Sequence, residues 1–589
     1  MKVFKRIFLA LFLIVLSALA IFLYINLHNP REPLPVVGKQ LEEEVKFQSR
    51  PWWEATTVYQ VYPRSFQDSN GDGIGDIPGI IMRLDYIRDL GFEAIWFSPF
   101  FQSPQQDFGY DISDYQAIAP EYGTMADVDS LIAAMHRRGM KVVFDLVLNH
   151  TSDQHAWFQE SRSSRDNPKA DWYVWRDGNG KEPPNNWHNA LGKSGWHYAP
   201  ERDQWYYAAF LPFQPDLNWW NPAVKDSMFA MVQYWLDKGV DGFRLDIFNF
   251  IYEDEQFRDN PRTLRYLPGP DMQKMNGQHL LYNLNHPQNI ILARELRSIL
   301  DDYGAPERFM VGEVFGYHRQ LRQLLGESED GLNLVFLLEM ANGLRWDVNF
   351  FREEIRTFEA FYPYPYSPTY VFSNHDGPRS ISQLGDDVRK ARLLALIQFS
   401  LRGVPFTYQG EEIGMPNGNI PLDEALDPLP AAIDYIPDFI RNSGLIFNRD
   451  NCRTPMQWEA GANAGFTTPQ ARPWLEVQAN CDSINVERQK QQDSSLLQTY
   501  QSLLALRRKN LPLQWGSLQL LEGQDLPTEV LAYRRSYQGQ VVEAYVNFSE
   551  RAISLPAQGE LLISIGEPKL TEGQLKLGAL EGVILGMPE

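Results

Sequence analysis

Cysteine and positive charge are both scarce in this sequence. Cys452 and Cys481 are its two cysteines, which excludes a disulfide framework and a cysteine-rich metal site but leaves open one bridge in an oxidising compartment or two free thiols. Lys and Arg number 54 against 75 Asp and Glu, which gives a net charge of −21. Because nucleic acids and anionic membrane surfaces repel such a chain, neither is expected as a partner.

Long hydrophobic runs are equally scarce, and the one that stands out is at the N-terminus. Residues 7–24 carry no charge and follow Lys2, Lys5 and Arg6. This run is nearly long enough to cross a hydrocarbon core of about 30 Å. We predict a signal anchor over residues 1–27, with the catalytic domain exported and held outside the cytoplasm, periplasmic or extracellular. A signal peptide cleaved near residues 18–20 is the alternative. Residues 28–50 have the composition of a linker.

The rest of the chain has the composition of a packed globular protein, with 44% hydrophobic and 22% charged residues. Strand-like apolar runs alternate with amphipathic helical runs, a pattern typical of a parallel sheet with crossover helices. Eight strands are expected at 58–62, 94–98, 141–148, 243–248, 309–314, 334–338, 370–373 and 406–408. Helices are expected at 80–90, 128–135, 222–236, 289–300, 351–361, 388–401 and 496–508.

These alternations predict an α/β fold, a (β/α)8 TIM barrel built from residues 51–150 and 223–510. Residues 151–222 break the pattern, because they are rich in Trp, Asn, Gly and Pro and lack a long helical period. We expect them to form a small domain inserted after strand 3. Residues 511–589 contain short strand-like runs at 530–534, 541–547 and 561–565, which predicts a C-terminal antiparallel β domain.

Charged residues occupy the ends of several expected strands. Arg244 and Asp246 lie on one apolar strand, where the period of 2 puts both side chains on the same side. By itself this pair would indicate a structural ion pair. Glu313 and Asp376, however, stand at equivalent positions on two other strands. Because catalytic groups of such barrels gather at the C-terminal ends of the strands, we predict a catalytic site there. Paired carboxylates are the apparatus of glycoside hydrolysis.

Four segments resemble the signature regions of the α-amylase family, glycoside hydrolase family 13: residues 145–150, 242–246, 312–313 and 374–376. Their order and approximate spacing match the family over residues 51–510. The resemblance implies that Asp246 is the nucleophile, Glu313 the general acid/base, and Asp376 the carboxylate that stabilises the transition state. Since the family works with retention, the two reacting carboxyl groups should lie about 5–5.5 Å apart.

Other residues take supporting roles on the same resemblance. His150 and His375 match histidines that bind sugar hydroxyls. Arg244 should hold Asp246 ionised through charge pairing, whereas apolar neighbours should keep the proton on Glu313 for longer.

Two further segments resemble the oligo-1,6-glucosidase branch of the family. Asp111, in residues 109–115, matches an aspartate that grips the terminal glucose in exo-acting α-glucosidases, and Arg453 matches an arginine beside it. A salt bridge between Asp111 and Arg453 would close the site beyond the first sugar. Residues 214–218 and 409–415 also resemble this branch. Ile247, after the nucleophile, leans towards α-1,6 specificity because it is β-branched and apolar like the Val of α-1,6 cleavers.

Potential oxygen ligands stand at every second residue of the loop that follows the first expected strand: Asp68, Asn70, Asp72, Ile74 and Asp76. This spacing suits Ca²⁺, although Gly79 stands where an EF-hand needs a bidentate Glu. The loop resembles a structural Ca²⁺ loop of the same branch, with Ile74 contributing its carbonyl. A polar turn without metal is the alternative. No organic cofactor is expected.

The function predicted is a retaining exo-α-glucosidase that acts on small oligosaccharides or disaccharides, through α-1,4 or α-1,6 linkages. A transglycosylase or isomerase, such as one making trehalose from maltose, needs the same residues and differs in how well it excludes water. A third hypothesis is a protein similar to the anchored heavy subunits of amino-acid transporters. Those proteins generally lack parts of the catalytic set that is complete here.

Overall fold

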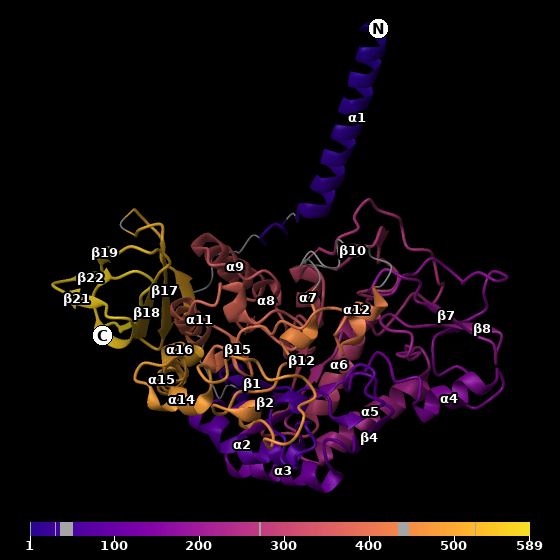
Figure 1. Cartoon of the computed structure of the whole chain (residues 1–589), viewed down its shortest axis with the longest axis horizontal. Helices are drawn as coiled ribbons and strands as arrows, with labels where there is room; N and C mark the ends of the chain where they lie inside the picture. The colour runs from indigo at the N-terminus through magenta and orange to yellow at the C-terminus, as the bar shows by residue number, and fades with distance from the viewer. Residues whose placement is uncertain are drawn as a thin grey trace.

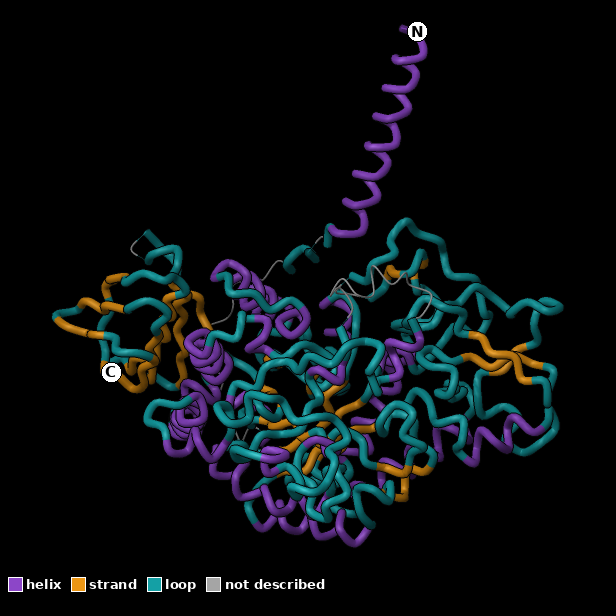
Figure 2. Tube along the Cα trace, viewed as in Figure 1, coloured by secondary structure: helices purple, strands orange, loops and turns teal. Residues whose placement is uncertain are grey.

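The computed structural model describes residues 2–29, 31–35, 51–269, 272–433, 447–524 and 526–588, so most of the expected linker lies outside the described residues. Its centre is a sheet of eight parallel strands (Figures 1 and 2). The strands are β1 (Val58–Val61), β2 (Ala94–Phe97), β5 (Lys141–Leu146), β9 (Gly242–Leu245), β12 (Phe309–Gly312), β13 (Leu334–Val335), β14 (Thr369–Val371) and β15 (Val404–Tyr408). All eight coincide with strands expected from the sequence.

The strand order is β13-β12-β9-β5-β2-β1-β15-β14. Apart from β13 and β14, barrel strands that follow one another along the chain are adjacent in this sheet, and the last strand, β15, pairs with the first, β1. Among the described residues no strand pairing joins β13 to β14. The hydroxyl of Thr369 spans this seam instead: it donates to the carbonyl of Val335 at 2.9 Å and accepts from the N–H of Leu337 at 2.9 Å. A side chain thus replaces the missing ladder bonds and closes the (β/α)8 barrel.

Helices surround the barrel: α2 (Ile77–Leu90), α3 (Met125–Arg137), α5 (Pro222–Asp237), α6 (Gln288–Asp301), α7 (His318–Leu324), α8 (Glu339–Asn342), α9 (Val348–Phe361), α10 (Ser380–Gln383), α11 (Val388–Ser400), α12 (Pro428–Ala432), α14 (Val486–Gln491) and α15 (Leu496–Lys509). Local sequence sets where they begin. Thr124 and Asp127 form a reciprocal capping box before α3, and the side chain of Asn221 caps α5, whose first residue is Pro222.

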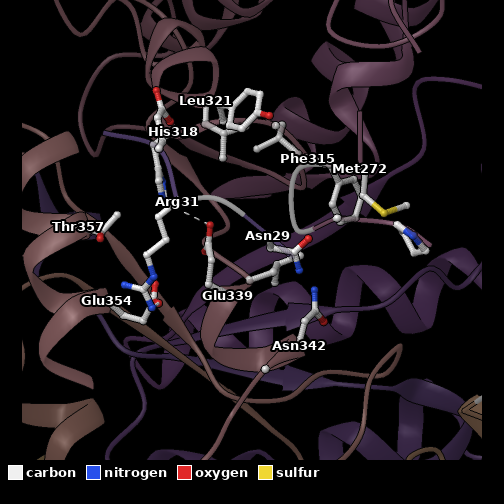
Figure 3. Close-up of a pocket in the computed structure, with 18 of the residues that line it drawn as sticks. Asn29, Arg31, Met272, Phe315, His318, Leu321, Glu339, Asn342, Glu354 and Thr357 are labelled. Carbon is white, nitrogen blue, oxygen red and sulfur yellow. Dashed lines mark hydrogen bonds and ion pairs between the residues drawn. The ribbon is translucent and has the colours of Figure 1, made fainter. Parts of the chain in front are cut away.

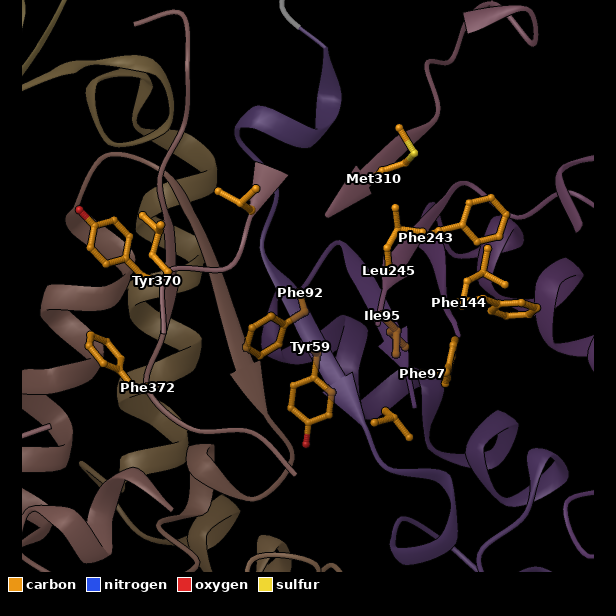
Figure 4. Close-up of a cluster of buried hydrophobic side chains, with 14 of the residues drawn as sticks. Tyr59, Phe92, Ile95, Phe97, Phe144, Phe243, Leu245, Met310, Tyr370 and Phe372 are labelled. Carbon is orange, nitrogen blue, oxygen red and sulfur yellow. The ribbon is translucent and has the colours of Figure 1, made fainter. Parts of the chain in front are cut away.

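The main core lies between the strands and these helices (Figure 4). Large side chains such as Tyr59, Phe97, Phe144 and Phe243 are fully or almost fully buried there. The strands therefore read as continuous apolar runs, because both of their faces are covered. Against this background Arg244, 1% exposed, is a conspicuous buried charge on β9.

The inserted segment forms a small unit of α4 (Ala156–Ser163) and a three-stranded antiparallel sheet of β6 (Trp175–Arg176), β7 (Trp196–Ala199) and β8 (Gln204–Tyr207). A short hairpin, β3 (Phe101–Gln102) with β4 (Asp114–Ile118), precedes it. A long excursion after β9, which carries β10 (Lys274–Met275) and β11 (Gln278–His279), packs on this unit, with Phe257 stacked on Trp187 at 5.3 Å. The sequence pattern did not predict that contact.

The C-terminal region is an antiparallel β domain, as expected. After α16 (Leu511–Trp515), one sheet holds β16 (Ser517–Leu520), β17 (Val530–Tyr537), β18 (Gln540–Asn547), β20 (Glu560–Ile565) and β23 (Gly582–Gly586). The other holds β19 (Ile553–Pro556), β21 (Lys569–Thr571) and β22 (Gln574–Leu577). Cys452 and Cys481 are free thiols, so the bridge considered from the sequence is not formed.

At the other end of the chain, α1 (Lys2–Leu27) projects away from the body of the molecule (Figure 1). Its segment Arg6–Leu27 has a mean hydropathy of 2.9 and is the one described helix long and apolar enough to cross a membrane. Length and composition alone support this assignment, which a signal sequence would also satisfy.

The seam between β13 and β14 can be tested through Thr369. We expect Thr369→Val to lower the free energy of unfolding by about 2–4 kcal/mol, because two buried backbone groups lose their partner. The melting temperature should fall accordingly. Thr407→Val is the matched control, since the buried Thr407 hydroxyl makes one long bond, 3.5 Å, to Gln398. An equal fall in both variants would contradict the role given to Thr369.

Candidate active site

The strand register brings the expected catalytic carboxylates to one height at the C-terminal rim of the barrel. Arg244 on β9 is level with Asp145 on β5 and with Val311 on β12. Because Leu245 pairs with Gly312, the residues that follow them, Asp246 and Glu313, leave their strands side by side. The structure therefore brings together residues that are far apart in the sequence.

One guanidinium binds three carboxylates at this rim. Arg244 donates to Asp145 Oδ1 at 2.8 Å, to Asp246 Oδ1 at 2.6 Å and to Glu313 Oε2 at 2.6 Å. The side chains of Asp246 and Glu313 are each 9% exposed. Such short charge-assisted bonds fix both carboxylates tightly, and they leave three acidic groups around a single positive charge.

Burial and the neighbouring carboxylates shift the pKa values of Asp246 and Asp145. Burial raises the pKa of Asp246 well above its ordinary value; Arg244 opposes this, while Glu313 and Asp145 add to it. Burial likewise raises the pKa of Asp145 to about 6 despite Arg244. Arg244 therefore favours the ionised form of Asp246, as expected, while burial and the neighbouring carboxylates oppose it.

The backbone turns sharply immediately after Asp246. Ile247 has φ 36° and ψ 44°, the left-handed conformation that a β-branched residue rarely adopts. The N–H of Ile247 points to Glu313 Oε2 at 3.3 Å, and its side chain is 6% exposed within a cluster that includes Trp187, Trp196 and Tyr207 of the inserted unit. The fourth strand thus ends at Leu245, earlier than expected, and the strained turn ties the rim to the inserted unit.

The two expected histidines are buried and neutral. Burial lowers the pKa of His375 to about 3 and that of His150 to about 4. His375 Nδ1 lies 2.8 Å from the amide nitrogen of Gln60, which can only donate, so the ring proton is on Nε2. Nε2 lies 2.7 Å from the hydroxyl of Tyr110 and 3.1 Å from Asp376 Oδ2. Neutral imidazoles held in this way suit hydrogen bonding to uncharged hydroxyls.

A second charged network joins Asp376 to Arg449 and Arg453. Arg449 donates to Asp376 Oδ1 at 2.9 Å, to Asp107 Oδ1 at 2.9 Å and to Asp427 Oδ1 at 2.7 Å. Arg453 reaches the same oxygen of Asp376 at 2.9 Å. Burial raises the pKa of Asp376, but His375, Arg449 and Arg453 outweigh it and hold that pKa well below its usual range. Asp376 is therefore ionised, and its side chain is 32% exposed.

The expected salt bridge between Asp111 and Arg453 is not formed. Asp111 is fully buried and accepts hydrogen bonds from the hydroxyl of Ser103 and from the N–H groups of Gln106 and Asp107, at 2.8–3.0 Å. It shapes the loop that presents Asp107. Asp107 forms the salt bridge instead, with Arg449, because the Asp111 carboxylate is bonded within its own loop.

The comparisons with known proteins can be placed on this geometry. A family model described as the alpha amylase catalytic domain matches residues 60–516. An oligo-1,6-glucosidase of Halalkalibacterium halodurans is 40% identical over 550 residues, which covers 89% of this chain and 94% of the relative. A probable alpha-glucosidase of Rhizobium meliloti is 40% identical over 515 residues, 85% of this chain and 90% of that one.

This chain is a glycoside hydrolase of the α-amylase family. Solved structures agree. The alpha-glucosyl transfer enzyme XgtA is 37% identical with a TM-score of 0.82, and the match covers 92% of this chain and 100% of the XgtA chain. The trehalulose synthase MutB from Pseudomonas mesoacidophila has a TM-score of 0.81 and 34% identity, with the same coverage of 92% and 100%.

Several residues of this glycoside hydrolase site were not predicted as site residues from the sequence. Asp107 and Arg449 lie four residues before Asp111 and Arg453, just outside the two segments that the resemblance singled out, so the salt bridge was expected between the wrong pair. Asp145 was expected in the first signature region, but its bond to Arg244 was not. Tyr110 gave no signal, because an aromatic residue beside a glycine is ordinary core filling.

The loop expected to hold calcium is closed by its own hydrogen bonds. Asp68 accepts from the backbone of Asn70, Gly71 and Gly73 and from the Thr467 hydroxyl, while Asn70 and Asp72 each accept from the N–H two residues on. Asp76 caps α2. Within the described residues no group of three or more His, Cys, Asp or Glu is arranged to hold a metal. The calcium site stays a prediction.

Proposed function

We propose that this enzyme is a retaining exo-acting α-glucosidase that releases terminal α-linked glucose from short oligosaccharides. The observations that carry the proposal are that Asp246 and Glu313 are fixed on one guanidinium, and that Arg449 joins Asp376 to Asp107. The bridge between Asp107 and Arg449 would close the site on one side. A site closed on one side admits the end of a saccharide and not its middle. The names of the glucosidase relatives support the same substrate class.

The two carboxylates take different roles. In the first step Asp246, ionised, attacks the anomeric carbon while Glu313 protonates the departing glycosidic oxygen. In the second step Glu313 accepts a proton from water, whose oxygen attacks the anomeric carbon and frees Asp246. Glu313 thus gives up one proton and takes one back in each cycle. Binding to the adjacent nitrogens of Arg244 keeps the pair close, as the expected separation of about 5–5.5 Å requires.

The second network would bind the glucosyl unit that reacts. Asp376, held ionised, faces positive charge that develops on the sugar ring in the oxocarbenium-like transition state. His150 and His375, both neutral, would hydrogen-bond sugar hydroxyls. Asp107 and Arg449 would bind the far end of the same ring, the role first given to Asp111 and Arg453.

Glucosyl transfer to an acceptor other than water is the second candidate, because two of the similar structures are an α-glucosyl transfer enzyme and a trehalulose synthase. It uses the same carboxylates. Linkage specificity depends on residues around the leaving group, among them Ile247, whose bulk on a strained turn favours α-1,6 over α-1,4 linkages. Part of the loop from Pro416 to Arg449 that would shape the same side, residues 434–446, lies outside the described residues.

We also propose that α1 is an uncleaved signal anchor that holds the enzyme outside the cytoplasm. Its apolar length and the basic residues Lys2, Lys5 and Arg6 before the span support this orientation. A non-catalytic transporter subunit with such an anchor is disfavoured, because the full set of catalytic residues is present and fixed by short bonds.

The hydrolytic proposal predicts the product. With maltose or isomaltose we expect glucose as the main product, released first as the α-anomer, as proton NMR of the early reaction can follow. Asp246→Asn should lower kcat by about 10⁴-fold or more with an unchanged melting temperature, because the nucleophile is lost. A new disaccharide as the main product would favour the transferase. The β-anomer, or full activity of Asp246→Asn, would contradict the mechanism.

Because Asp107, and not Asp111, forms the salt bridge, substitutions at these two aspartates should have different effects on activity and stability. Asp107→Asn should lower kcat/KM on maltose by about 10²-fold while the melting temperature changes little, because the sugar loses its oriented partner. Asp111→Asn should mainly lower the melting temperature, because Asp111 holds the loop. If Asp111→Asn instead abolished activity in a protein of unchanged stability, the original assignment of Asp111 would be restored.

We further propose that the loop of residues 68–76 binds one structural Ca²⁺, through side chains of Asp68, Asn70, Asp72 and Asp76 and the carbonyl of Ile74. Its all-oxygen donor set fits that ion. Ca²⁺ at about 100 times its Kd should stabilise the protein by about 2.7 kcal/mol relative to EDTA, read as a higher melting temperature. Asp72→Ala should remove the response with little effect on activity. A wild type indifferent to Ca²⁺ would exclude the site.

A further inference from the structure

The end of α1 binds a loop more than two hundred residues away. Asn26, 4% exposed, donates to the carbonyl of Leu264 at 3.0 Å and accepts from the N–H groups of Tyr266 and Leu267 at 2.6 and 3.1 Å. Arg265 donates to the carbonyls of Ile25 and His28 at 3.2 and 3.1 Å. The last turn of a helix leaves such carbonyls without partners, so this loop serves as the C-terminal cap of α1.

The same loop exposes large apolar side chains beside α1. Leu264 is 60% exposed, Tyr266 53% and Leu267 50%, and Leu281 from the same excursion is 51% exposed. These values hold with α1 in place, and Tyr266 also touches Phe22 of the helix, with ring centroids 5.9 Å apart. We call residues 264, 266 and 267 the apolar patch. Exposed side chains of this kind gathered in one place mark an interaction site.

The apolar patch lies on the catalytic face of the barrel. Its loop belongs to the excursion that follows β9, the strand that carries Arg244. The residues just after α1 bind the same face: Glu32 pairs with Arg319 in α7, which follows β12, and Arg31 pairs with Glu354 in α9, which follows β13.

A cavity of about 750 Å³ lies at this junction. Asn29, Arg31, His318, Glu339 and Glu354 line it, and Arg31 is bonded to Glu354 at 2.8 Å (Figure 3). Its lining also includes Val314 and Phe315, the residues after Glu313. The segment that leaves the membrane helix therefore forms part of the surroundings of the catalytic rim.

We propose that the apolar patch is a second membrane contact, which seats the catalytic rim on the outer surface of the bilayer. This inference rests on the signal anchor proposed above. The span ends at Leu27, so the bilayer boundary lies at the level of Asn26, and Asn26 is bonded to the backbone of the patch. Side chains at that level meet the interface between lipid headgroups and acyl chains, where Tyr and Leu are favourable.

A lipid partner also fits the charge of the chain. Because the net charge is −21, attraction to anionic lipid cannot hold the body on a membrane. Apolar insertion does not depend on that attraction, and Arg265 is already bound to the helix end. Two contacts with the bilayer, through α1 and through the apolar patch, fix the orientation of the barrel relative to the membrane. A membrane span followed by a flexible linker would leave that orientation free. Substrate would then enter from the side, between the rim and the lipid surface.

Nitroxide labels on the full chain in phosphatidylcholine nanodiscs test the depth of the patch. In a Cys481→Ser background, where the remaining Cys452 is buried, labels are placed at Leu267→Cys and separately at Leu264→Cys. Leu13→Cys, in α1 and 53% exposed, reports on the anchor. Leu561→Cys, 42% exposed on the C-terminal domain, is the matched control. Collision rates with oxygen and with a water-soluble nickel complex give the depth of each label.

We expect the ratio of oxygen to nickel collisions to be several-fold higher at 13, 264 and 267 than at 561. If the label at 13 is in lipid while those at 264 and 267 match the label at 561, the membrane contact is overturned and the anchor stands. If the label at 13 is also aqueous, both are overturned. The glucosidase activity of the same samples, assayed on maltose, is independent of these outcomes.

Discussion

The bonds of Arg244 to Asp145, Asp246 and Glu313 are the interaction on which the rest of the site depends. A guanidinium buried in the barrel would be unfavourable without partners, and three carboxylates supply them. The same bonds hold Asp246 and Glu313 at one height. Catalytic function and the stability of a buried charge are thus satisfied by one arrangement, which makes Arg244 a poor position for any substitution.

The surrounding fold serves to keep this cluster in place. The barrel register sets the heights of the carboxylates, and the Thr369 hydroxyl closes the seam between the strands on either side of it. The strained turn at Ile247 ties Asp246 to the inserted unit, while Arg449 joins Asp376, Asp107 and Asp427 in a second network. The end of α1 binds the loop that follows β9, the strand that carries Arg244.

Much of this could be predicted because the signals were local or periodic. Strands buried on both faces read as apolar runs and amphipathic helices show a helical period, so the eight strands and the seven helices α2, α3, α5, α6, α9, α11 and α15 were found. Asp246, Glu313 and Asp376 stood out because carboxylates at the ends of apolar strands are costly unless used. The seam at Thr369 and the packing of Phe257 on Trp187 gave no such signal, because they join segments distant in sequence.

By itself, then, the sequence determined the architecture, the family and the three central carboxylates, since each depends on residue type and on position along one strand. Tertiary structure decided how charges are distributed. It paired Asp107 with Arg449 rather than Asp111 with Arg453, and it raised the pKa of Asp246 although Arg244 is adjacent. The physical reason is that a side chain's direction and the sum of charges around a buried group depend on loops converging from the whole chain, which no local pattern records.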